Sequence, residues 1–262
     1  MPYIRIRDKN IYYKEYGKGE PIVFLNGVMM GTNSWSPFIP IVSKEYRMIT
    51  VDLLDQGRSD NYEGEYSIDT QVQIFKYFLD QLKLNKVHLI GMSYGGKVAQ
   101  SFAIKYEDRI KSLILSNTTS YTTNIMKDMG KGWDFAASTL NGTIFSSIIM
   151  PYMYSSNYYE KNYQDIKIRE KVFSNILNEN WYKRFKRILN SGKNYNVLNQ
   201  IKSIKVPTLI ISSEFDRITP LKYQQLINEQ INDSKWVIIE DSGHASIYEK
   251  PKEFISTIMN FV

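Results

Sequence analysis

Hydrophobic and polar positions along the chain form short runs, either apolar or alternating, with helix-like spacing between them. Such runs are typical of strands that are buried on one or both faces. Eight runs are predicted to be strands: residues 3–7, 11–16, 21–26, 47–53, 86–92, 110–117, 207–214 and 235–240. The first two lie near enough to form a hairpin, and helix-length segments separate the later ones, as parallel strands require.

The segments between the later strands show helical periodicity. Over residues 68–84 the apolar positions recur at spacings of three and four: Val72, Phe75, Leu79 and Leu82. Further helices are predicted over residues 93–106, 220–231 and 251–261. The pattern predicts an α/β fold, with a mostly parallel eight-stranded sheet and helices on both faces.

The alternation of strands and helices breaks once. About 90 residues separate the strand that ends at residue 117 from the one that begins at residue 207, whereas such connections usually take about two to six. Within this segment, residues 177–189 carry an apolar stripe at helical spacing. We therefore expect an inserted helical cap over residues 120–205 and a catalytic core formed by residues 1–119 and 206–262.

Composition and charge exclude several classes of protein. The chain has no cysteine, which removes disulfides, thiolate catalysis and cysteine metal sites. No apolar run approaches the roughly 20 residues of a membrane span. Residues 1–10 lack the apolar stretch of a secretory signal, so the cytoplasm is the expected compartment. Residues 121–205 hold 13 Lys and Arg against 6 Asp and Glu, so the positive charge of the chain is concentrated there.

A candidate nucleophile lies between a predicted strand and a predicted helix. Residues 91–95 match G-x-S-x-G, with Ser93 at the sharp turn where the strand ends. Small residues two positions to either side let the backbones approach without clashing. The amide of Tyr94 then lies at a helix N-terminus, where unpaired N–H groups favour a developing oxyanion. The motif therefore supplies both a candidate nucleophile, Ser93, and one of the two expected oxyanion donors, the Tyr94 amide.

A serine nucleophile needs a base, and the chain contains only two histidines. His88 lies within the strand that leads to Ser93, about 16 Å away along an extended chain, and is expected to be a packed structural residue. His244 follows the last predicted strand, in a loop at its carboxyl end, where open α/β sheets place their chemistry. His244 is therefore the expected base.

The residue that orients this base should be a carboxylate at another strand end. Asp216 follows the strand predicted over residues 207–214, which gives the chain order Ser, Asp, His. Glu214 is an alternative orienting acid, and Asp241 is expected to form a turn before the glycine that precedes His244. The predicted catalytic set is Ser93, Asp216 and His244.

With these motifs, the chain resembles the α/β-hydrolase superfamily, in particular its capped carboxylesterase and carbon–carbon hydrolase branch. The similarity covers nearly the whole chain. Residues 51–60 resemble the family's D-x-x-G-x-G-x-S loop, and residues 243–254 resemble its G-H-x(4)-E-x-P-x-x-F ending. The resemblance implies that the second oxyanion donor is the Val28 amide, which follows Asn26 and Gly27. Asn26 stands where the family usually has histidine, which puts the local hydrogen bonding in question.

The resemblance also implies an activity. Serine at position 93 disfavours the dehalogenase and epoxide hydrolase branches, whose nucleophile is a carboxylate. It favours a serine hydrolase that cleaves an ester, thioester or related acyl bond of a small, largely apolar molecule through an acyl-enzyme, without metal or cofactor. Alternatives on the same fold are a carbon–carbon bond hydrolase, a perhydrolase, a cofactor-free lyase, or a ligand-binding receptor or regulatory protein.

Substrate clues are fewer. Four residues near the proposed oxyanion positions are expected to line an apolar pocket: Met29, Met30, Trp35 and Met92. For Met92, packing in the core is an equally good explanation. The cap also holds tyrosines that either line the entrance or hold the subdomain together: Tyr152, Tyr154, Tyr158, Tyr159 and Tyr163.

A basic stretch within the cap permits one further hypothesis about partners. Four basic residues form either a solvated helix face or a surface that steers an anionic substrate or an acidic carrier protein: Lys183, Arg184, Lys186 and Arg187. No nucleic-acid-binding motif is present.

Overall fold

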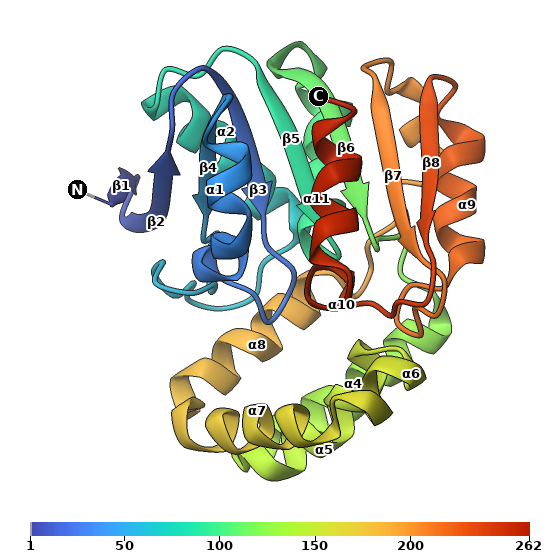
Figure 1. Ribbon diagram of the computed structural model, residues 1–262. Helices are drawn as coiled ribbons and strands as arrows, with labels where there is room; N and C mark the ends of the chain where they lie inside the picture. Colours follow the sequence, from blue (N-terminus) through green and yellow to red (C-terminus); the bar gives the residue numbers. More distant parts are fainter. Residues whose placement is uncertain (1) are drawn as a thin grey trace.

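The computed structural model describes residues 2–262 and contains one eight-stranded sheet (Figure 1). The strands are β1 (Tyr3–Ile6), β2 (Lys9–Tyr16), β3 (Glu20–Leu25), β4 (Tyr46–Val51), β5 (Val87–Met92), β6 (Ile110–Ser116), β7 (Thr208–Ser213) and β8 (Ser234–Ile239). Their order is β1-β2-β4-β3-β5-β6-β7-β8; β2 is antiparallel to both of its neighbours, and every later pairing is parallel. All eight predicted strands are confirmed.

Both faces of the sheet are covered because side chains of the central strands alternate between two apolar layers. In β3, Val23 and Leu25 belong to one layer, and Ile22 and Phe24 belong to the other. Side chains of α2 (Ile68–Gln81), α3 (Tyr94–Lys105) and α9 (Leu221–Gln230) fill the first layer. The 3-10 helix η1 (Thr32–Phe38), α1 (Ile39–Val42), α10 (Ser246–Glu249) and α11 (Pro251–Met259) cover the second.

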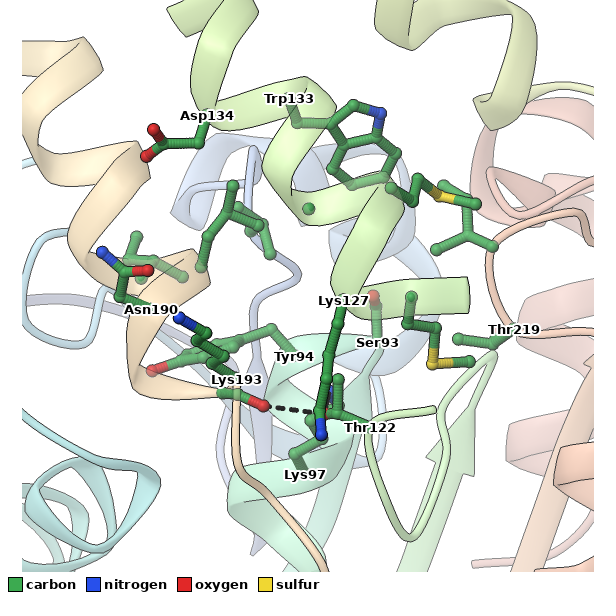
Figure 2. Close-up of a pocket in the computed structure, with 18 of the residues that line it drawn as sticks. Ser93, Tyr94, Lys97, Thr122, Lys127, Trp133, Asp134, Asn190, Lys193 and Thr219 are labelled. Carbon is green, nitrogen blue, oxygen red and sulfur yellow. Dashed lines mark hydrogen bonds between the residues drawn. The ribbon is translucent and has the colours of Figure 1, made fainter. Parts of the chain in front are cut away.

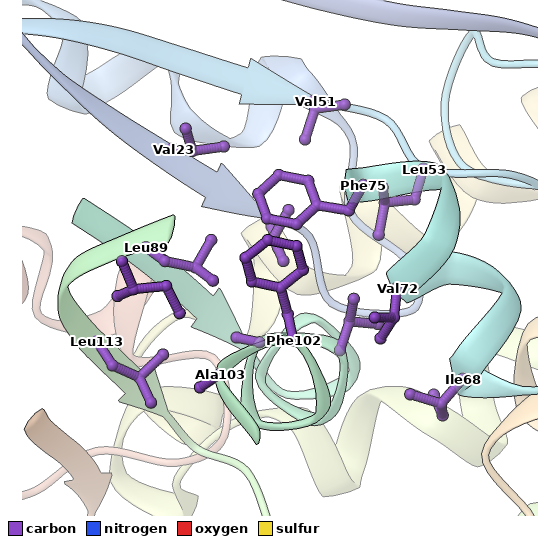
Figure 3. Close-up of a cluster of buried hydrophobic side chains, with 14 of the residues drawn as sticks. Val23, Val51, Leu53, Ile68, Val72, Phe75, Leu89, Phe102, Ala103 and Leu113 are labelled. Carbon is purple, nitrogen blue, oxygen red and sulfur yellow. The ribbon is translucent and has the colours of Figure 1, made fainter. Parts of the chain in front are cut away.

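The first layer is centred on aromatic side chains from α2 and α3 (Figure 3). Phe75 and Phe102 are fully buried and meet edge to face, with ring centroids 4.8 Å apart. Such edge-to-face pairs add to the stabilisation that comes from burial of the rings. This packing joins α2 to α3, which also contacts β5 and begins directly after Ser93.

Five α-helices occupy the long connection between β6 and β7, and we call them the helical insertion. They are α4 (Asn124–Ser138), α5 (Gly142–Met153), α6 (Ser156–Lys161), α7 (Tyr163–Ile176) and α8 (Glu179–Ser191). Figure 1 shows them together beyond the carboxyl ends of the parallel strands. They have an apolar cluster of their own, which includes Phe145, Tyr182 and Phe185. Every helix in residues 2–262 is too short or too polar to span a bilayer.

Phe102 provides a test of the packing that positions α3. Replacement of Phe102 with Ala should lower the free energy of unfolding by about 3–5 kcal/mol, because it leaves a cavity in a close-packed layer. The matched control is Phe135→Ala in α4, where the ring is 73% exposed; this change should stay within about 0.5 kcal/mol. Urea denaturation checks both, and equal losses would contradict the described packing.

Candidate active site

Ser93 lies at the junction of β5 and α3 in a strained backbone conformation. Its φ is 53° and its ψ is −112°, outside the regions that residues other than glycine usually adopt. The Ser93 amide donates to the carbonyl of Ser116 at 2.8 Å, and the Thr118 hydroxyl donates to the Ser93 carbonyl at 2.8 Å. Bonds from the neighbouring strand β6 and the residues after it therefore hold the turn in place.

The two glycines of the motif are required by close backbone contacts. A Cβ atom on Gly91 would lie 2.5 Å from the carbonyl oxygen of Gly95, and a Cβ atom on Gly95 would lie 2.4 Å from the carbonyl oxygen of Leu25. Both distances are shorter than real carbon–oxygen contacts, and the opposing atoms are backbone atoms. The spacing of the motif thus follows from how closely α3 approaches β3 and β5.

Three side chains from three strand ends form one hydrogen-bonded line. His244 Nε2 lies 2.9 Å from Ser93 Oγ, and His244 Nδ1 lies 2.8 Å from Asp216 Oδ2. Asp216 follows β7, and His244 follows β8. Since parallel strands end at one edge of the sheet, residues distant in sequence meet there. This is the geometry of a nucleophile, a base and a group that orients the base.

The carboxylate of Asp216 is buried and well supplied with donors. Its Oδ1 accepts the amides of Ile218 and Thr219, each at 2.8 Å, and its Oδ2 accepts the Thr219 hydroxyl at 2.7 Å. Burial alone would raise the pKa of Asp216, but the adjacent His244 and these hydrogen bonds lower it below its ordinary value. Asp216 is therefore ionised at neutral pH and favours a proton on His244 Nδ1, which leaves Nε2 as the acceptor facing Ser93.

The alternative acids and the second histidine lie elsewhere. Glu214 is exposed and accepts the amide of Asp241, while Asp241 accepts the side-chain amide of Asn157 at 2.7 Å. His88 is buried in β5 beside Ser112 and Glu20, with its Nδ1 2.8 Å from the Ser112 hydroxyl. None of these three residues contacts the line through His244.

The Val28 amide is oriented by the hydrogen bonds of the preceding carbonyl. The Gly27 carbonyl accepts the Gln56 side chain at 3.2 Å and the Met30 amide at 3.3 Å. In a trans peptide the N–H points away from the C=O, so these bonds turn the Val28 N–H in the opposite direction. Val28, Ser93 and Tyr94 line the same cavity, and within residues 2–262 no protein group accepts the Val28 N–H.

Asn26 satisfies the hydrogen bonds of this loop without histidine. Its side-chain amide donates to the Val51 carbonyl at 2.9 Å and to Asp52 Oδ1 at 3.0 Å, and its oxygen accepts Trp35 Nε1 at 2.7 Å. Gln56 also donates to the Asn26 carbonyl at 3.3 Å. An amide offers both donors and an acceptor, so this buried position is fully bonded.

A cavity of about 330 Å³ extends from Ser93 between the sheet edge and the helical insertion (Figure 2). We call it the Ser93 cavity. Its apolar lining comes mostly from the insertion: Val28, Met126, Met129, Trp133, Ile188, Leu189 and Ile218. Its polar lining includes the turn residue, the residue that follows it and several lysines: Ser93, Tyr94, Lys97, Thr122, Lys127, Lys131, Asp134, Asn190, Lys193 and Thr219.

The four predicted pocket residues do not line the Ser93 cavity. Trp35 and Met92 are buried in the second apolar layer, and Met30 packs against that layer with its sulfur 3.3 Å from the Gly27 amide. Met29 packs on the apolar cluster of the insertion. The prediction relied on closeness in sequence to Val28 and Tyr94, the expected oxyanion donors, whereas the cavity is walled by α4 and α8.

The tyrosines of the helical insertion also do not line the cavity. Tyr154 stacks on Tyr158 with ring centroids 5.3 Å apart, and Tyr159 packs against Tyr163. Tyr152 lies near Trp133, with ring centroids 6.4 Å apart. These contacts match the interpretation that the tyrosines hold the insertion together.

The two arginines of α8 do not form a free surface. Arg184 donates to three carbonyls of the loop after β4, those of Asp55, Gly57 and Ser59, at 2.9–3.0 Å. Arg187 forms a bidentate pair with the buried Asp55 carboxylate, at 2.5 and 2.9 Å. The structure thus corrects the steering hypothesis for this pair, because both arginines fasten the insertion to the sheet.

The two lysines of the same stretch have partners within the insertion. Lys183 pairs with Glu179 at 2.6 Å, and Lys186 lies 3.5 Å from Asp134 and donates to the Ser138 hydroxyl at 2.8 Å. Steering of an anionic substrate or an acidic carrier protein by these two lysines stays a prediction.

A second attachment joins the insertion to the His244 loop. Glu249 accepts the Gly243 amide at 3.0 Å and the Ser155 hydroxyl at 2.6 Å, and the Ala245 amide donates to the Met153 carbonyl at 2.8 Å. Burial raises the pKa of Glu249, while these donors lower it in part. The helical insertion therefore touches the residues on both sides of His244.

Several residues that support the site were not found from the sequence. Thr219 follows Asp216 by three residues, a spacing typical of local side chain-to-backbone turns, and this could have indicated its role. Lys97 follows Ser93 by one helical turn, which places both on one face of α3. No local signal marks Gln56, because its contacts are set by the fold.

The chain is similar to known hydrolases over almost its whole length. A family model described as "alpha/beta hydrolase fold" matches residues 20–251. The proline iminopeptidase of Saccharolobus solfataricus is 28% identical, over 99% of this chain and 91% of that protein. The 2-hydroxy-6-oxo-6-(2'-aminophenyl)hexa-2,4-dienoic acid hydrolase of Metapseudomonas resinovorans is 24% identical, over 95% of this chain and 86% of that protein.

A solved structure extends this similarity to the arrangement in space. MGS-M2, an alpha/beta hydrolase enzyme from a Medee basin deep-sea metagenome library, is 34% identical to the chain and has a TM-score of 0.97. The match covers 99% of this chain and 96% of MGS-M2. The similarity therefore includes the helical insertion as well as the sheet.

Gly95 provides a test of the turn at Ser93. Gly95→Ala should lower the free energy of unfolding by about 1–3 kcal/mol, because the new Cβ overlaps backbone atoms of Leu25 and Asn26. Gly132→Ala in α4 is the matched control, since nothing lies within 4 Å of a Cβ there. It should be neutral or stabilising by up to about 1 kcal/mol. Thermal and urea unfolding measure both, and a neutral Gly95→Ala would refute the close approach.

Proposed function

We propose that this chain, which belongs to the alpha/beta-hydrolase family, is a serine hydrolase that cleaves an ester-type bond of a small, largely apolar substrate. The observation that carries the proposal is the hydrogen-bonded line from Ser93 through His244 to Asp216. Family membership makes the protein a hydrolase. The three side chains supply a mechanism for that class of reaction.

In the first half of the proposed reaction, Ser93 Oγ attacks the carbonyl carbon of the ester while His244 Nε2 accepts the hydroxyl proton. Asp216 stabilises the imidazolium that forms. The negative charge that develops on the carbonyl oxygen is stabilised by the amides of Val28 and Tyr94. The carbon–oxygen bond to the alcohol then breaks, His244 gives its proton to the departing alcohol, and Ser93 is left acylated.

In the second half, water takes the place of the alcohol. His244 accepts a proton from this water as its oxygen attacks the acyl carbon, and the same two amides stabilise the oxyanion. The bond between Ser93 and the acyl group breaks, and His244 returns the proton to Ser93 Oγ. The products are one carboxylic acid and one alcohol.

The Ser93 cavity supports a small substrate. Its volume of about 330 Å³ lies at the lower end of the range of about 300–1,000 Å³ for small-molecule sites. Met126, Trp133 and Leu189 provide an apolar wall near the proposed nucleophile. An acyl or alkoxy group of a few carbons would bury its surface there.

The charges around the cavity favour an ester over a peptide with a free amino terminus. A protonated amine needs a carboxylate partner when it is buried. Among the lining residues in the described chain, Asp134 is the single carboxylate, and it lies 3.5 Å from Lys186. The lining also includes Lys97, Lys127 and Lys193. These charges oppose a cationic substrate, although one relative is a peptidase by name.

Carbon–carbon bond hydrolysis is the second candidate. It is favoured by the Metapseudomonas relative, whose name describes a hydrolase of an oxo-substituted dienoic acid. The same line of Ser93, His244 and Asp216 would act on a ketone carbonyl, but the leaving carbon would have to be protonated. Simple esters distinguish the candidates, because efficient turnover of unactivated esters favours the first.

We further propose that residues 120–205 act as a cap over the proposed nucleophile, with the core formed by residues 1–119 and 206–262. The support is that α4 and α8 wall the Ser93 cavity, while Arg184, Arg187 and Ser155 fix the insertion to the core. The substrate would then bind between the two parts.

The role of Ser93 is tested with p-nitrophenyl esters of two to ten acyl carbons. The wild type should show a clear optimum at short acyl chains because the cavity is small. Ser93→Ala should lower kcat at least about 10⁴-fold through loss of the nucleophile. Ser256→Ala, an exposed serine in α11, should stay within about twofold. Turnover that survives in Ser93→Ala would refute the proposed nucleophile.

The role of Asp216 is tested against that of Glu214. Asp216→Asn should lower kcat roughly 10³- to 10⁴-fold at pH 7, because the neutral amide no longer favours the productive tautomer of His244. Glu214→Gln should have little effect, since Glu214 contacts the Asp241 amide instead. Steady-state kinetics on the best ester measure both variants. A large loss in Glu214→Gln with an active Asp216→Asn would reverse the assignment.

A further inference from the structure

Lys97 lies in the Ser93 cavity one helical turn after the proposed nucleophile (Figure 2). Its ammonium group donates to the Thr122 hydroxyl at 2.7 Å, and Thr122 in turn donates to the Gly192 carbonyl at 2.7 Å. The Tyr195 ring lies beneath it, 5.4 Å from the nitrogen to the ring centroid. One N–H of the Lys97 ammonium group thus donates to a neutral oxygen, that of Thr122. The Thr122 hydroxyl is itself oriented by its bond to the Gly192 carbonyl.

The charge of Lys97 has no counter-ion in the protein. Within residues 2–262, no carboxylate forms a salt bridge with Lys97, and burial lowers its pKa to about 8. At neutral pH the group therefore still carries a positive charge. Lys97 is half-buried. An ammonium group in a partly enclosed cavity is normally paired, because an unpaired charge in a low-dielectric site is costly. A negatively charged ligand group would supply the missing partner.

The surroundings of Lys97 increase the positive potential of the cavity. Lys127 from α4 and Lys193 from the segment after α8 line the same space. The lining carboxylate, Asp134, lies 3.5 Å from Lys186 of α8. An anion near Lys97 would therefore meet three lysines, none of which forms a salt bridge within residues 2–262. Lys131 also lines the cavity, but it pairs with Asp128.

The spacing along α3 limits where the anion lies. Side chains four residues apart on a helix have Cβ atoms about 5–6 Å apart, and Ser93 and Lys97 both line the cavity. Both residues line one cavity of about 330 Å³, which limits the molecule to a few carbons between its ester and its acid. The same molecule can then contact Ser93 with its ester and Lys97 with its acid.

We propose that Lys97 is a specificity-determining residue, and that with Lys127 and Lys193 it binds the carboxylate of a short ester substrate that also carries a free acid group. This inference rests on the proposed ester hydrolysis at Ser93. It narrows the substrate from a small apolar ester to the half-ester of a short dicarboxylic acid, or to an acylated hydroxy acid.

A purely structural role for Lys97 makes a different prediction. Through Thr122, Lys97 ties the end of the insertion at Gly192 to α3. If that were its whole contribution, its replacement would lower stability and affect anionic and neutral esters alike. The ratio of kcat/KM values for matched esters separates the two roles, because a general loss of folded protein cancels in the ratio.

The experiment uses two pairs of esters that differ in one carboxylate. Monoethyl glutarate is compared with ethyl pentanoate, which places the acid on the acyl side, and 4-acetoxybutanoate is compared with butyl acetate, which places it on the alcohol side. Proton release in a pH-stat at pH 7 gives kcat and KM for each. In the wild type, the anionic member of at least one pair should have about a tenfold higher kcat/KM.

Variants then assign the preference to Lys97. Lys97→Met removes the charge and should lower the anionic-to-neutral ratio about tenfold, mainly through KM, whereas Lys97→Arg should retain part of the preference. Lys105→Met is the matched control on the same helix, because Lys105 pairs with Asp69 outside the cavity. Its ratio should equal that of the wild type. Melting curves establish that each variant is folded.

The outcomes separate the inference from the proposed function. Equal or lower kcat/KM for both anionic esters in the wild type would overturn the carboxylate preference and leave ester hydrolysis intact. A preference that persists in Lys97→Met would overturn the assignment to Lys97. Failure of the wild type to hydrolyse any of the four esters would instead count against the proposed function.

A measurement on the wild type alone covers the case in which Lys97→Met does not fold. Butyrate should inhibit the hydrolysis of ethyl pentanoate competitively, with a Ki at least about tenfold below that of 1-butanol. Equal inhibition by the acid and the alcohol would overturn the proposed anion subsite.

Discussion

The left-handed backbone of Ser93 is the constraint on which the rest of the site depends. A positive φ at a residue other than glycine costs about 1–3 kcal/mol and persists only when the surrounding structure enforces it. Here the enforcement comes from the Ser116 carbonyl, the Thr118 hydroxyl and the close approach of Gly95 to β3. The strained turn brings the Ser93 hydroxyl to His244 and places the Tyr94 amide at the start of α3.

The helical insertion and the site are mechanically joined, although they are separate in sequence. Arg184 donates to three carbonyls of the loop after β4, and Asn26 donates to Asp52 at the start of the same loop. One hydrogen-bond network therefore connects α8 to the segment of Asn26 and Val28. At the other side, Glu249 links Ser155 to the loop of His244. The insertion therefore supplies walls to the Ser93 cavity and also restrains the loops that carry the proposed catalytic groups.

The fold could be predicted from the sequence because its signals are local: strand runs, helical periodicity and one long connection. The meeting of Ser93, His244 and Asp216 followed from strand ends sharing one edge. The cavity could not be predicted, because its walls come from the insertion, whose placement is decided by long-range pairs such as Arg187 with Asp55. Sequence proximity therefore assigned Trp35 to a pocket, whereas it packs in the core.

The central claim is that Ser93 is a nucleophile activated by His244. Its most direct test is covalent labelling by a fluorophosphonate activity-based probe, followed by mass spectrometry of peptides. A phosphonate on Ser93 that forms rapidly in the wild type, and at least about 10³-fold more slowly in His244→Ala, would show an activated serine that depends on this histidine. No adduct on Ser93, or labelling at an equal rate without His244, would contradict the account.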